Sequence, residues 1–449
     1  MNSHRRQLVS LAHPVYLSLL ASVAAGIINT VWVSRLGGPA VAAVAVATTT
    51  ENVLLGIALV FASGTTVLIA HGRGARDPAA IRSALRGGLA LCALVTPVVV
   101  TTGFLLREPL ARLILGDTGP ELPLTVAYFT ISLPGIAVFY VQQLVDGILK
   151  GTGDTRTPMR LALLANGLIL VCDPFLIHLY GVQGAAASTV LCRVVALGVG
   201  LRALRRNALL RGTKAAPAES TPAESTPAES VSAAPRRTVT TGLPMSADFT
   251  VRQGGGLVLV AIVARLGVTA VAAYAIGYKV LYVATMAFYS VRQAAAIHTS
   301  HLRGEGRDAR REVGREAMLV SGIVGAGAAV LLLLTAPWIM AAFGAGPQVA
   351  HEGVLFLRCV GPYLLLLACF IALGGVFEGS GGAPALLRVT VLGTAVQLPL
   401  AYGLLGLGLP GVCLALALSM GVQCAVVAVL FRRRVRCQED VEGAFDRVA

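Results

Sequence analysis

An aspartate within an apolar stretch has the clearest potential for chemistry in this sequence. Asp173 stands in the run from Leu161 to Tyr180, which is long enough and apolar enough to cross a membrane. An ionised carboxylate inside hydrocarbon is costly, so it needs a partner, a water-filled cavity or a proton. This position is therefore suited to the uptake and release of a proton or a sodium ion.

Other polar groups are expected near Asp173. Asn166 precedes it by seven residues, which is nearly two helical turns, and therefore shares its helix face. Thr189 lies in the next apolar run, at a similar depth of roughly 10 Å from the turn between the runs. Pro174 has no backbone N–H and frees a carbonyl group one turn earlier, which could meet a cation or water. These groups predict one polar site.

An internal ion pair is the alternative role for Asp173. Arg193 lies in the following apolar run and could reach back to neutralise the aspartate permanently. Glu51 is another acid in an apolar run; it either lines a cavity or pairs with Lys279 or Arg292.

Further polar residues fall within apolar runs. Asp248 and Arg252 are four residues apart, so we expect them to pair on one helix face, where they could also exchange partners with a charged substrate. Gln142 and Gln143 could bind substrate or hold helices together. Three charged residues are expected at cytoplasmic helix ends, solvated or capping: Asp146, Lys150 and Glu378.

The elements that position these residues are membrane helices. Charged residues make up 13% of the 449 residues, apolar residues 56%, and the mean hydropathy is +0.77, which no soluble core accommodates. The expected spans are 11–34, 40–70, 85–106, 122–149, 158–180, 182–204, 241–264, 269–299, 315–343, 350–377, 384–408 and 410–431. The first run is longer than the apolar core of a signal peptide and is expected to remain as an anchor.

The net charge of +14 indicates topology rather than binding to nucleic acid. Arginines gather in the loops that alternate along the chain, which places both termini in the cytoplasm of a bacterium and the protein in its inner membrane. The eight cysteines show no CxxC pair and no spacing typical of metal ligands, so we expect free thiols and no metal cluster.

The chain divides into two similar halves. The segment AESTPAESTPAES, from Ala218 to Ser230, has nothing to bury and predicts a disordered cytoplasmic linker. The expected parts are an amino-terminal lobe at 1–204, the linker at 205–240, a carboxy-terminal lobe at 241–431 and a tail at 432–449. The stretch that begins at Ser34 aligns with the one at Ala264, and the stretch at His71 aligns at the same offset with His301. The repeats therefore predict two pseudo-symmetric six-helix bundles in the same orientation.

The order of polar motifs in the first half resembles a known family, the multidrug and toxic compound extrusion (MATE) transporters. The motifs are Gly147-Ile-Leu-Lys-Gly-Thr-Gly-Asp-Thr-Arg-Thr-Pro-Met, Asn166, Cys172-Asp173-Pro174 and Gly181-Val-Gln-Gly-Ala-Ala-Ala-Ser-Thr189. The resemblance covers the twelve-helix core and fails at the linker and tails. It implies export of organic cations, drugs or metabolites in exchange for protons or sodium ions, and it marks Asp173 as part of a cation-binding lobe.

The sequence departs from the family pattern near the expected sites. Asn29 stands where the family often has an acid, so it is either a polar lining residue or part of an interhelical hydrogen bond. Ile169 replaces a frequent asparagine, and Gln253 lies near the place where sodium-coupled relatives carry an acid. A sodium site in the second lobe is therefore not expected.

These features predict an all-α integral membrane protein of twelve transmembrane helices that acts as a secondary antiporter. We expect a monomer in the lipid bilayer, with a small-molecule substrate, H⁺ or Na⁺ as coupling ion, no cofactor and no nucleic acid. The alternative is a flippase for lipid-linked precursors, which belongs to the same superfamily. An enzyme is not expected, because the chain lacks a GxxxxGK[ST] phosphate loop, an HExxH motif and a catalytic triad signature.

Overall fold

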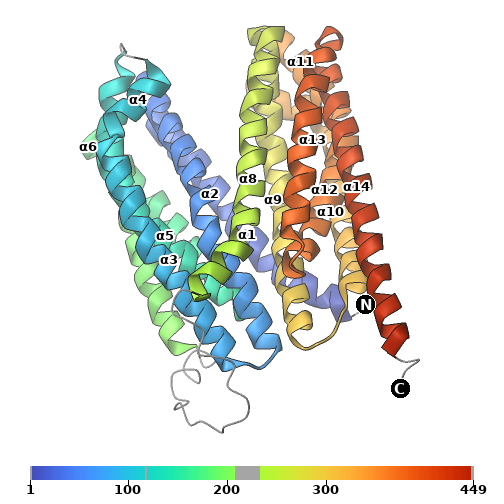
Figure 1. Ribbon diagram of the computed structural model, residues 1–449. Coiled ribbons are helices and arrows are strands. Elements are labelled where there is room, and N and C mark those ends of the chain that lie inside the picture. The colour runs from blue at the N-terminus through green and yellow to red at the C-terminus, as the bar shows by residue number, and fades with distance from the viewer. Residues whose placement is uncertain (1–2, 117–118, 208–232, 446–449) are drawn as a thin grey trace. The chain divides into compact units, whose positions relative to one another are not determined.

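The computed structural model describes residues 3–116, 119–207 and 233–445, and this part of the chain contains helices and no strand (Figure 1). The helices are α1 (Ser3–Ser34), α2 (Gly38–Gly74), α3 (Pro78–Leu105), α4 (Arg107–Leu115), α5 (Glu121–Gly151), α6 (Arg156–Arg206), α8 (Ala233–Val263), α9 (Val268–Gly304), α10 (Arg310–Ala342), α11 (Pro347–Cys359), α12 (Gly361–Gly379), α13 (Ala383–Gly403) and α14 (Gly408–Phe445). Two short 3₁₀ helices, η1 (Ala264–Leu266) and η2 (Leu405–Leu407), precede α9 and α14.

Eleven of the described helices are long and apolar enough to cross a membrane, and α6 contains two spans. Its 51 residues would extend roughly 75 Å as one straight helix, more than twice the hydrocarbon thickness. Gly181 breaks it with a φ of 58° and a ψ of −133°, which a residue without a Cβ adopts readily. A Cβ on Gly184 would collide with the carbonyl oxygen of Leu176, so the two segments meet closely after the break. The expected boundary between 158–180 and 182–204 is confirmed.

Two boundaries differ from the sequence-based expectation. The expected span at 350–377 is divided into α11 and α12 at Val360, just before Pro362, whose ring removes a backbone donor. Helix α8 begins at Ala233, although the linker was expected to continue to residue 240. The repeat from Ala218 to Ser230 lies outside the described residues.

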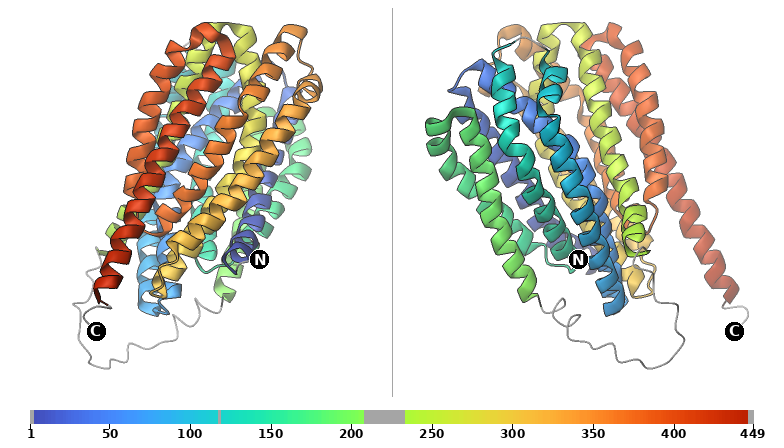
Figure 2. Two further views of the ribbon diagram at one scale, coloured as in Figure 1. Left: turned by 90° about the vertical axis from the view of Figure 1, so that its right-hand side faces the viewer. Right: turned by 60° about the vertical axis from the view of Figure 1, so that its left-hand side comes forward.

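The chain forms two compact units. The first unit is Leu17–Ser246, and the second is Met1–Tyr16 together with Ala247–Ala449. In the first unit, α5 packs against α2, α3 and α6; in the second, α12 packs in the same way against α9, α10 and α14 (Figure 2). The helices of the two units thus pack in equivalent arrangements, in agreement with the sequence repeat. The first part of α1, as far as Tyr16, belongs to the second unit, and the first part of α8, as far as Ser246, belongs to the first unit.

The first part of α8 lies so close to α2 in the first unit that the backbones of the two helices are nearly in contact. A Cβ on Gly242 would collide with the carbonyl oxygen of Val60 in α2, and one on Gly64 would lie 2.5 Å from the carbonyl oxygen of Thr238. The Ser246 hydroxyl donates a hydrogen bond of 2.5 Å to the carbonyl oxygen of Gly56. Small residues thus allow α8 to approach α2 more closely than side chains normally permit.

We expect Gly242→Ala to destabilise the protein by about 1–3 kcal/mol, because the added methyl group forces α8 away from Val60. The matched control is Gly254→Ala on the same helix, where a Cβ meets no atom within 4 Å. Thermal unfolding of both variants in detergent measures the difference. Equal melting temperatures for the two variants would show that the close approach contributes nothing.

The first part of α1 is held within the second unit by polar contacts. Arg5 Nε donates to Glu316 Oε2 at 2.6 Å, and the Glu316 side chain is only 4% exposed. His4 Nδ1 lies 3.0 Å from His298 Nε2. The beginning of α1 is therefore fixed to α9 and α10.

Candidate cation and substrate sites

Asp173 and Asn29 form the centre of the first candidate site. Asp173, in the first segment of α6, is completely buried, and Asn29 Nδ2 in α1 donates to its Oδ2 at 2.7 Å. A second contact joins the same helices two turns away, where Asn166 Nδ2 donates to Ser22 Oγ at 3.3 Å. Each pair is separated by 144 residues along the chain, so α1 runs parallel to this segment of α6.

One carboxylate oxygen of Asp173 has no hydrogen bond of good geometry to a described residue, and the Ser188 hydroxyl lies beside this aspartate. This oxygen, Oδ1, and the Ser188 hydroxyl are both buried. An unpaired buried carboxylate oxygen is unfavourable unless it gains a proton or a cation. Sequence analysis missed Ser188; its position beside Thr189 was the available signal. The Thr189 hydroxyl instead donates to the carbonyl oxygen of Ala185 at 3.1 Å.

The expected alternative partners are corrected by the structure. Arg193 Nη2 lies 3.3 Å from Glu51 Oε2 in α2, and its Cζ lies 4.9 Å from the centre of the Phe139 ring. Arg193 therefore does not pair with Asp173, and Glu51 pairs with neither Lys279 nor Arg292. The ring of Phe139 and the carboxylate of Glu51 draw the guanidinium towards α5 and α2. Among the described residues, Asp173 has no cationic partner.

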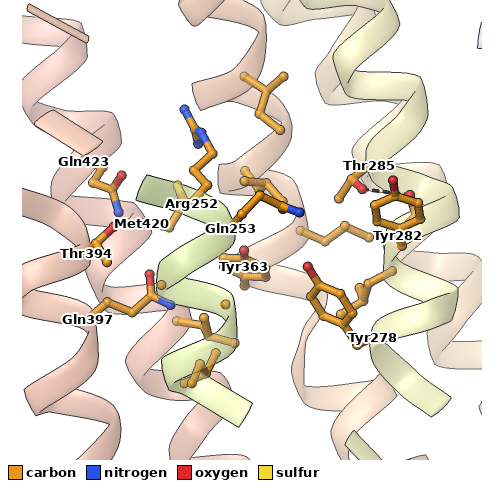
Figure 3. Close-up of a pocket in the computed structure, with 18 of the residues that line it drawn as sticks. Arg252, Gln253, Tyr278, Tyr282, Thr285, Tyr363, Thr394, Gln397, Met420 and Gln423 are labelled. Carbon is orange, nitrogen blue, oxygen red and sulfur yellow. Dashed lines mark hydrogen bonds between the residues drawn. The ribbon is translucent and has the colours of Figure 1, made fainter. Parts of the chain in front are cut away.

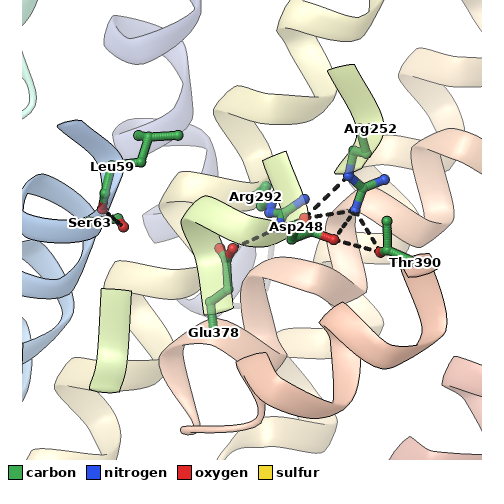
Figure 4. A network of polar contacts seen from close by, with 7 residues as sticks. All are labelled: Leu59, Ser63, Asp248, Arg252, Arg292, Glu378 and Thr390. Atoms are coloured by element: carbon green, nitrogen blue, oxygen red, sulfur yellow. Dashed lines mark hydrogen bonds and ion pairs between the residues drawn. The ribbon is translucent and has the colours of Figure 1, made fainter. Parts of the chain in front are cut away.

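A second group of charged side chains lies within the second unit (Figure 4). Arg252 Nη2 donates to both oxygens of Asp248 at 2.9 Å, which confirms the expected pair on α8. Arg292 Nη2 from α9 adds contacts of 2.6 Å to Asp248 Oδ2 and to Glu378 Oε1, and Thr390 donates to Asp248 Oδ1 at 2.5 Å. Two carboxylates and two guanidinium groups are thus brought together with no net charge.

Glu378 and Asp146 differ from the solvated helix-end positions expected for them. A Cβ on Gly375 would collide with the carbonyl oxygen of Arg292, so α12 meets α9 at backbone distance and Glu378 is buried against Arg292. Asp146 Oδ1 is buried in α5 with no hydrogen-bond partner among the described residues. Hydropathy alone does not reveal that Glu378 and Asp146 Oδ1 are buried.

A cavity next to the charged group contains Gln253. Arg252 and Gln253 of α8 line it together with tyrosines of α9 and α12 and with polar residues of α13 and α14 (Figure 3). Gln142 and Gln143 lie elsewhere, in α5; Gln142 Oε1 is buried without a partner among the described residues, and Gln143 is half-buried. Among the nine predicted site residues, Asn29, Asn166 and Asp173 take part in the contacts between α1 and α6, and Asp248 and Gln253 lie in the charged group and its cavity. Glu51 pairs with Arg193, Thr189 bonds to the backbone of α6, and Gln142 and Gln143 lie on α5.

A protein-family model matches both halves of the chain. The model named MatE matches residues 14–175 and 244–403, which is one match for each half of the repeat. The chain belongs to the MATE family. It is thus a multi-pass membrane transporter and not an enzyme, as predicted.

Two curated relatives match most of the chain, and a third matches less than half of it. A probable multidrug resistance protein NorM of Thermotoga maritima is 24% identical over 409 residues, which cover 89% of this chain and 85% of that protein. DNA damage-inducible protein F of Escherichia coli is 26% identical over 456 residues, which cover 97% and 94%. An FAD transporter of Shewanella oneidensis is 26% identical over 200 residues, which cover 43% and 44%.

Solved structures confirm the MATE fold. A crystal structure of MATE in complex with MaL6 superposes with a TM-score of 0.87 at 21% identity and covers 98% of both chains. A transporter of the MOP superfamily from Pyrococcus furiosus, described as having a binding pocket of reverse polarity, also gives a TM-score of 0.87, at 22% identity. The match covers 98% of this chain and 97% of that transporter. The predicted arrangement of twelve helices in two bundles is therefore confirmed.

Proposed function

We propose that this MATE protein exports small organic molecules in exchange for protons, with Asp173 as the coupling residue. The observation that carries this proposal is a fully buried carboxylate that has one oxygen bound by Asn29, the other beside the Ser188 hydroxyl without a well-formed hydrogen bond, and no cationic partner among the described residues. An acid in this environment favours a bound proton in one state of the transporter and releases it when water reaches the site in another. The names of the relatives, which include multidrug resistance proteins, support a small organic substrate.

The donor set around Asp173 favours a proton over a sodium ion. Hard cations require several oxygen ligands, whereas a proton needs only one carboxylate oxygen and an acceptor. Asn29 presents its nitrogen to the carboxylate, and Ser188 is the nearby hydroxyl without a well-formed hydrogen bond to a described residue. A protonated Asp173 can donate a hydrogen bond to Ser188, which would satisfy both groups.

Efflux from proteoliposomes under separately imposed gradients tests this proposal. We expect a proton gradient to drive the export of a small fluorescent aromatic substrate, and a sodium gradient at equal pH to have no effect. The control is the same vesicle with the gradient dissipated by an ionophore. Export that follows sodium alone would contradict proton coupling, and export in neither case would contradict the antiporter.

A further inference from the structure

The cavity of the second unit has an aromatic wall. Tyr274, Tyr278 and Tyr282 follow one another at intervals of four residues on α9, and Tyr289 and Tyr363 also line the cavity. Tyr274 and Tyr278 are stacked, with ring centres 5.9 Å apart and planes inclined by 23°. A wall of stacked rings favours a flat aromatic ligand, because offset stacking adds to the gain from apolar burial.

The same cavity contains polar groups without protein partners. Within the described parts of the chain, the amides of Gln253, Gln397 and Gln423 form no hydrogen bond, although the Gln423 residue is only 4% exposed. Buried amides in proteins are normally hydrogen-bonded, and each can both donate and accept. In Figure 3, Gln397 and Gln423 lie on one side of Gln253, Tyr278 and Tyr282 lie on the other, and Tyr363 lies next to Gln253. The cavity is thus equipped for a ligand with polar groups around an aromatic centre.

Arg252 is the charged side chain that reaches the cavity from the ion-pair group. It is the charged residue in the lining as the structure describes it, and its Nε and Nη2 are bound to Asp248. No hydrogen bond of Nη1 to a described residue is present, so this nitrogen is available as a donor. The two neighbouring carboxylates, Asp248 and Glu378, are both engaged with arginines and do not line the cavity.

We propose that this cavity binds a flat aromatic anion, with a carboxylate or a similar group on Arg252 Nη1, the ring against the tyrosines, and the remaining polar groups on the glutamines. A charge-assisted hydrogen bond from arginine to a carboxylate is among the stronger polar contacts available. A cationic ligand would meet the rings but would find no counter-charge in the lining and would be opposed by Arg252. This inference rests on the proposed export function and names a substrate class for it.

Three probes with the same ring and different charge test the inference. Isothermal titration of the full chain in lipid nanodiscs, with empty nanodiscs as background, compares 2-naphthoate, 2-naphthylmethylammonium and neutral 2-naphthalenemethanol. We expect 2-naphthoate to bind at least about tenfold more tightly than the ammonium compound. Arg252→Gln should reduce the affinity for 2-naphthoate by about tenfold while that for the alcohol stays within a factor of about two.

Control variants separate the loss of charge from the loss of structure. Asp248 keeps its contacts with Arg292 and Thr390 when Arg252 is replaced, and Arg252→Lys restores the charge. Gly256→Leu should block all three probes, because Gly256 lines the cavity and an added Cβ would approach only the Tyr278 hydroxyl, at 3.9 Å. Gly254→Leu, two residues earlier on the same helix, should leave binding unchanged, because an added Cβ there meets no atom within 4 Å and Gly254 does not line the cavity.

The titration needs no ion gradient, so its outcome is separate from that of the efflux experiment. Tighter binding of the ammonium probe, or binding of 2-naphthoate that Arg252→Gln does not alter, would overturn the inference whatever the efflux result. Binding that depends on Arg252 would support it even if no gradient drives export, in which case the antiporter proposal alone would fail.

Discussion

Replacing Asp173 with asparagine should reduce gradient-driven export to the level of protein-free vesicles while leaving the protein folded. The amide cannot take up and release the proton, whereas its size and its acceptor oxygen preserve the contact with Asn29. Arg193 is paired with Glu51, so the change leaves no buried guanidinium without its partner. Efflux under an imposed proton gradient measures the effect, and thermal unfolding verifies the fold.

Substrate exchange without a gradient is the control for Asp173→Asn. A variant that has lost only coupling should still exchange labelled substrate across the membrane at equal concentrations, because the neutral amide mimics the protonated acid. Asp173→Glu keeps the carboxyl group and should retain part of the coupled export. A response to the proton gradient that persists in Asp173→Asn would remove this residue from the coupling step.

Arg292→Leu should cause a loss of stability of about 3–5 kcal/mol, the largest of the substitutions considered. The guanidinium is buried and contacts both Asp248 and Glu378 at 2.6 Å, so its removal leaves Glu378 without its ion-pair partner and Asp248 with Arg252 alone. An uncompensated charge in a low-dielectric interior is more costly than the loss of the pair itself. Unfolding by heat or by denaturing detergent measures the change.

The double variant Arg292→Leu with Glu378→Gln is the matched test of that cause. Removing the orphaned charge should restore part of the lost stability, so the two effects should not add. The contrary result is that the stability losses of Arg292→Leu and Glu378→Gln simply add in the double variant. In that case the lost stability of Arg292→Leu has another origin, such as the close packing of Gly375 against the backbone of Arg292.

Local contacts could be predicted from the sequence, and distant ones could not. Asp248 and Arg252 are four residues apart on one helix, so their pair follows from helix geometry alone. The partners of Glu51 and Glu378 are 142 and 86 residues away and depend on which helices pack together. The sequence repeat predicts equivalent bundles, but it does not state which side chains meet inside them.

The aromatic wall of the cavity has a recognisable pattern in the sequence. Tyr274, Tyr278 and Tyr282 recur with the spacing of one helix face, which a count of apolar residues treats as ordinary membrane helix. Asn29 was placed near Asp173 through the family pattern, whereas the direction of its hydrogen bond required the structure. Intramembrane charge and helix limits are thus easier to predict than the polar lining of a cavity.

The exchange of helix segments between the units has a consequence for biosynthesis. The surface of α2 that receives Gly242 and Ser246 cannot be covered until the ribosome has passed the linker, because both residues follow it in the chain. Domains generally fold as units in the order of their synthesis. We therefore expect the part of α2 around Gly56, Val60 and Gly64 to lack this packing until residues 233–246 have been synthesised. Two half-length polypeptides cut after residue 204 would therefore each lack a piece of their own structure and would depend on assembly with one another.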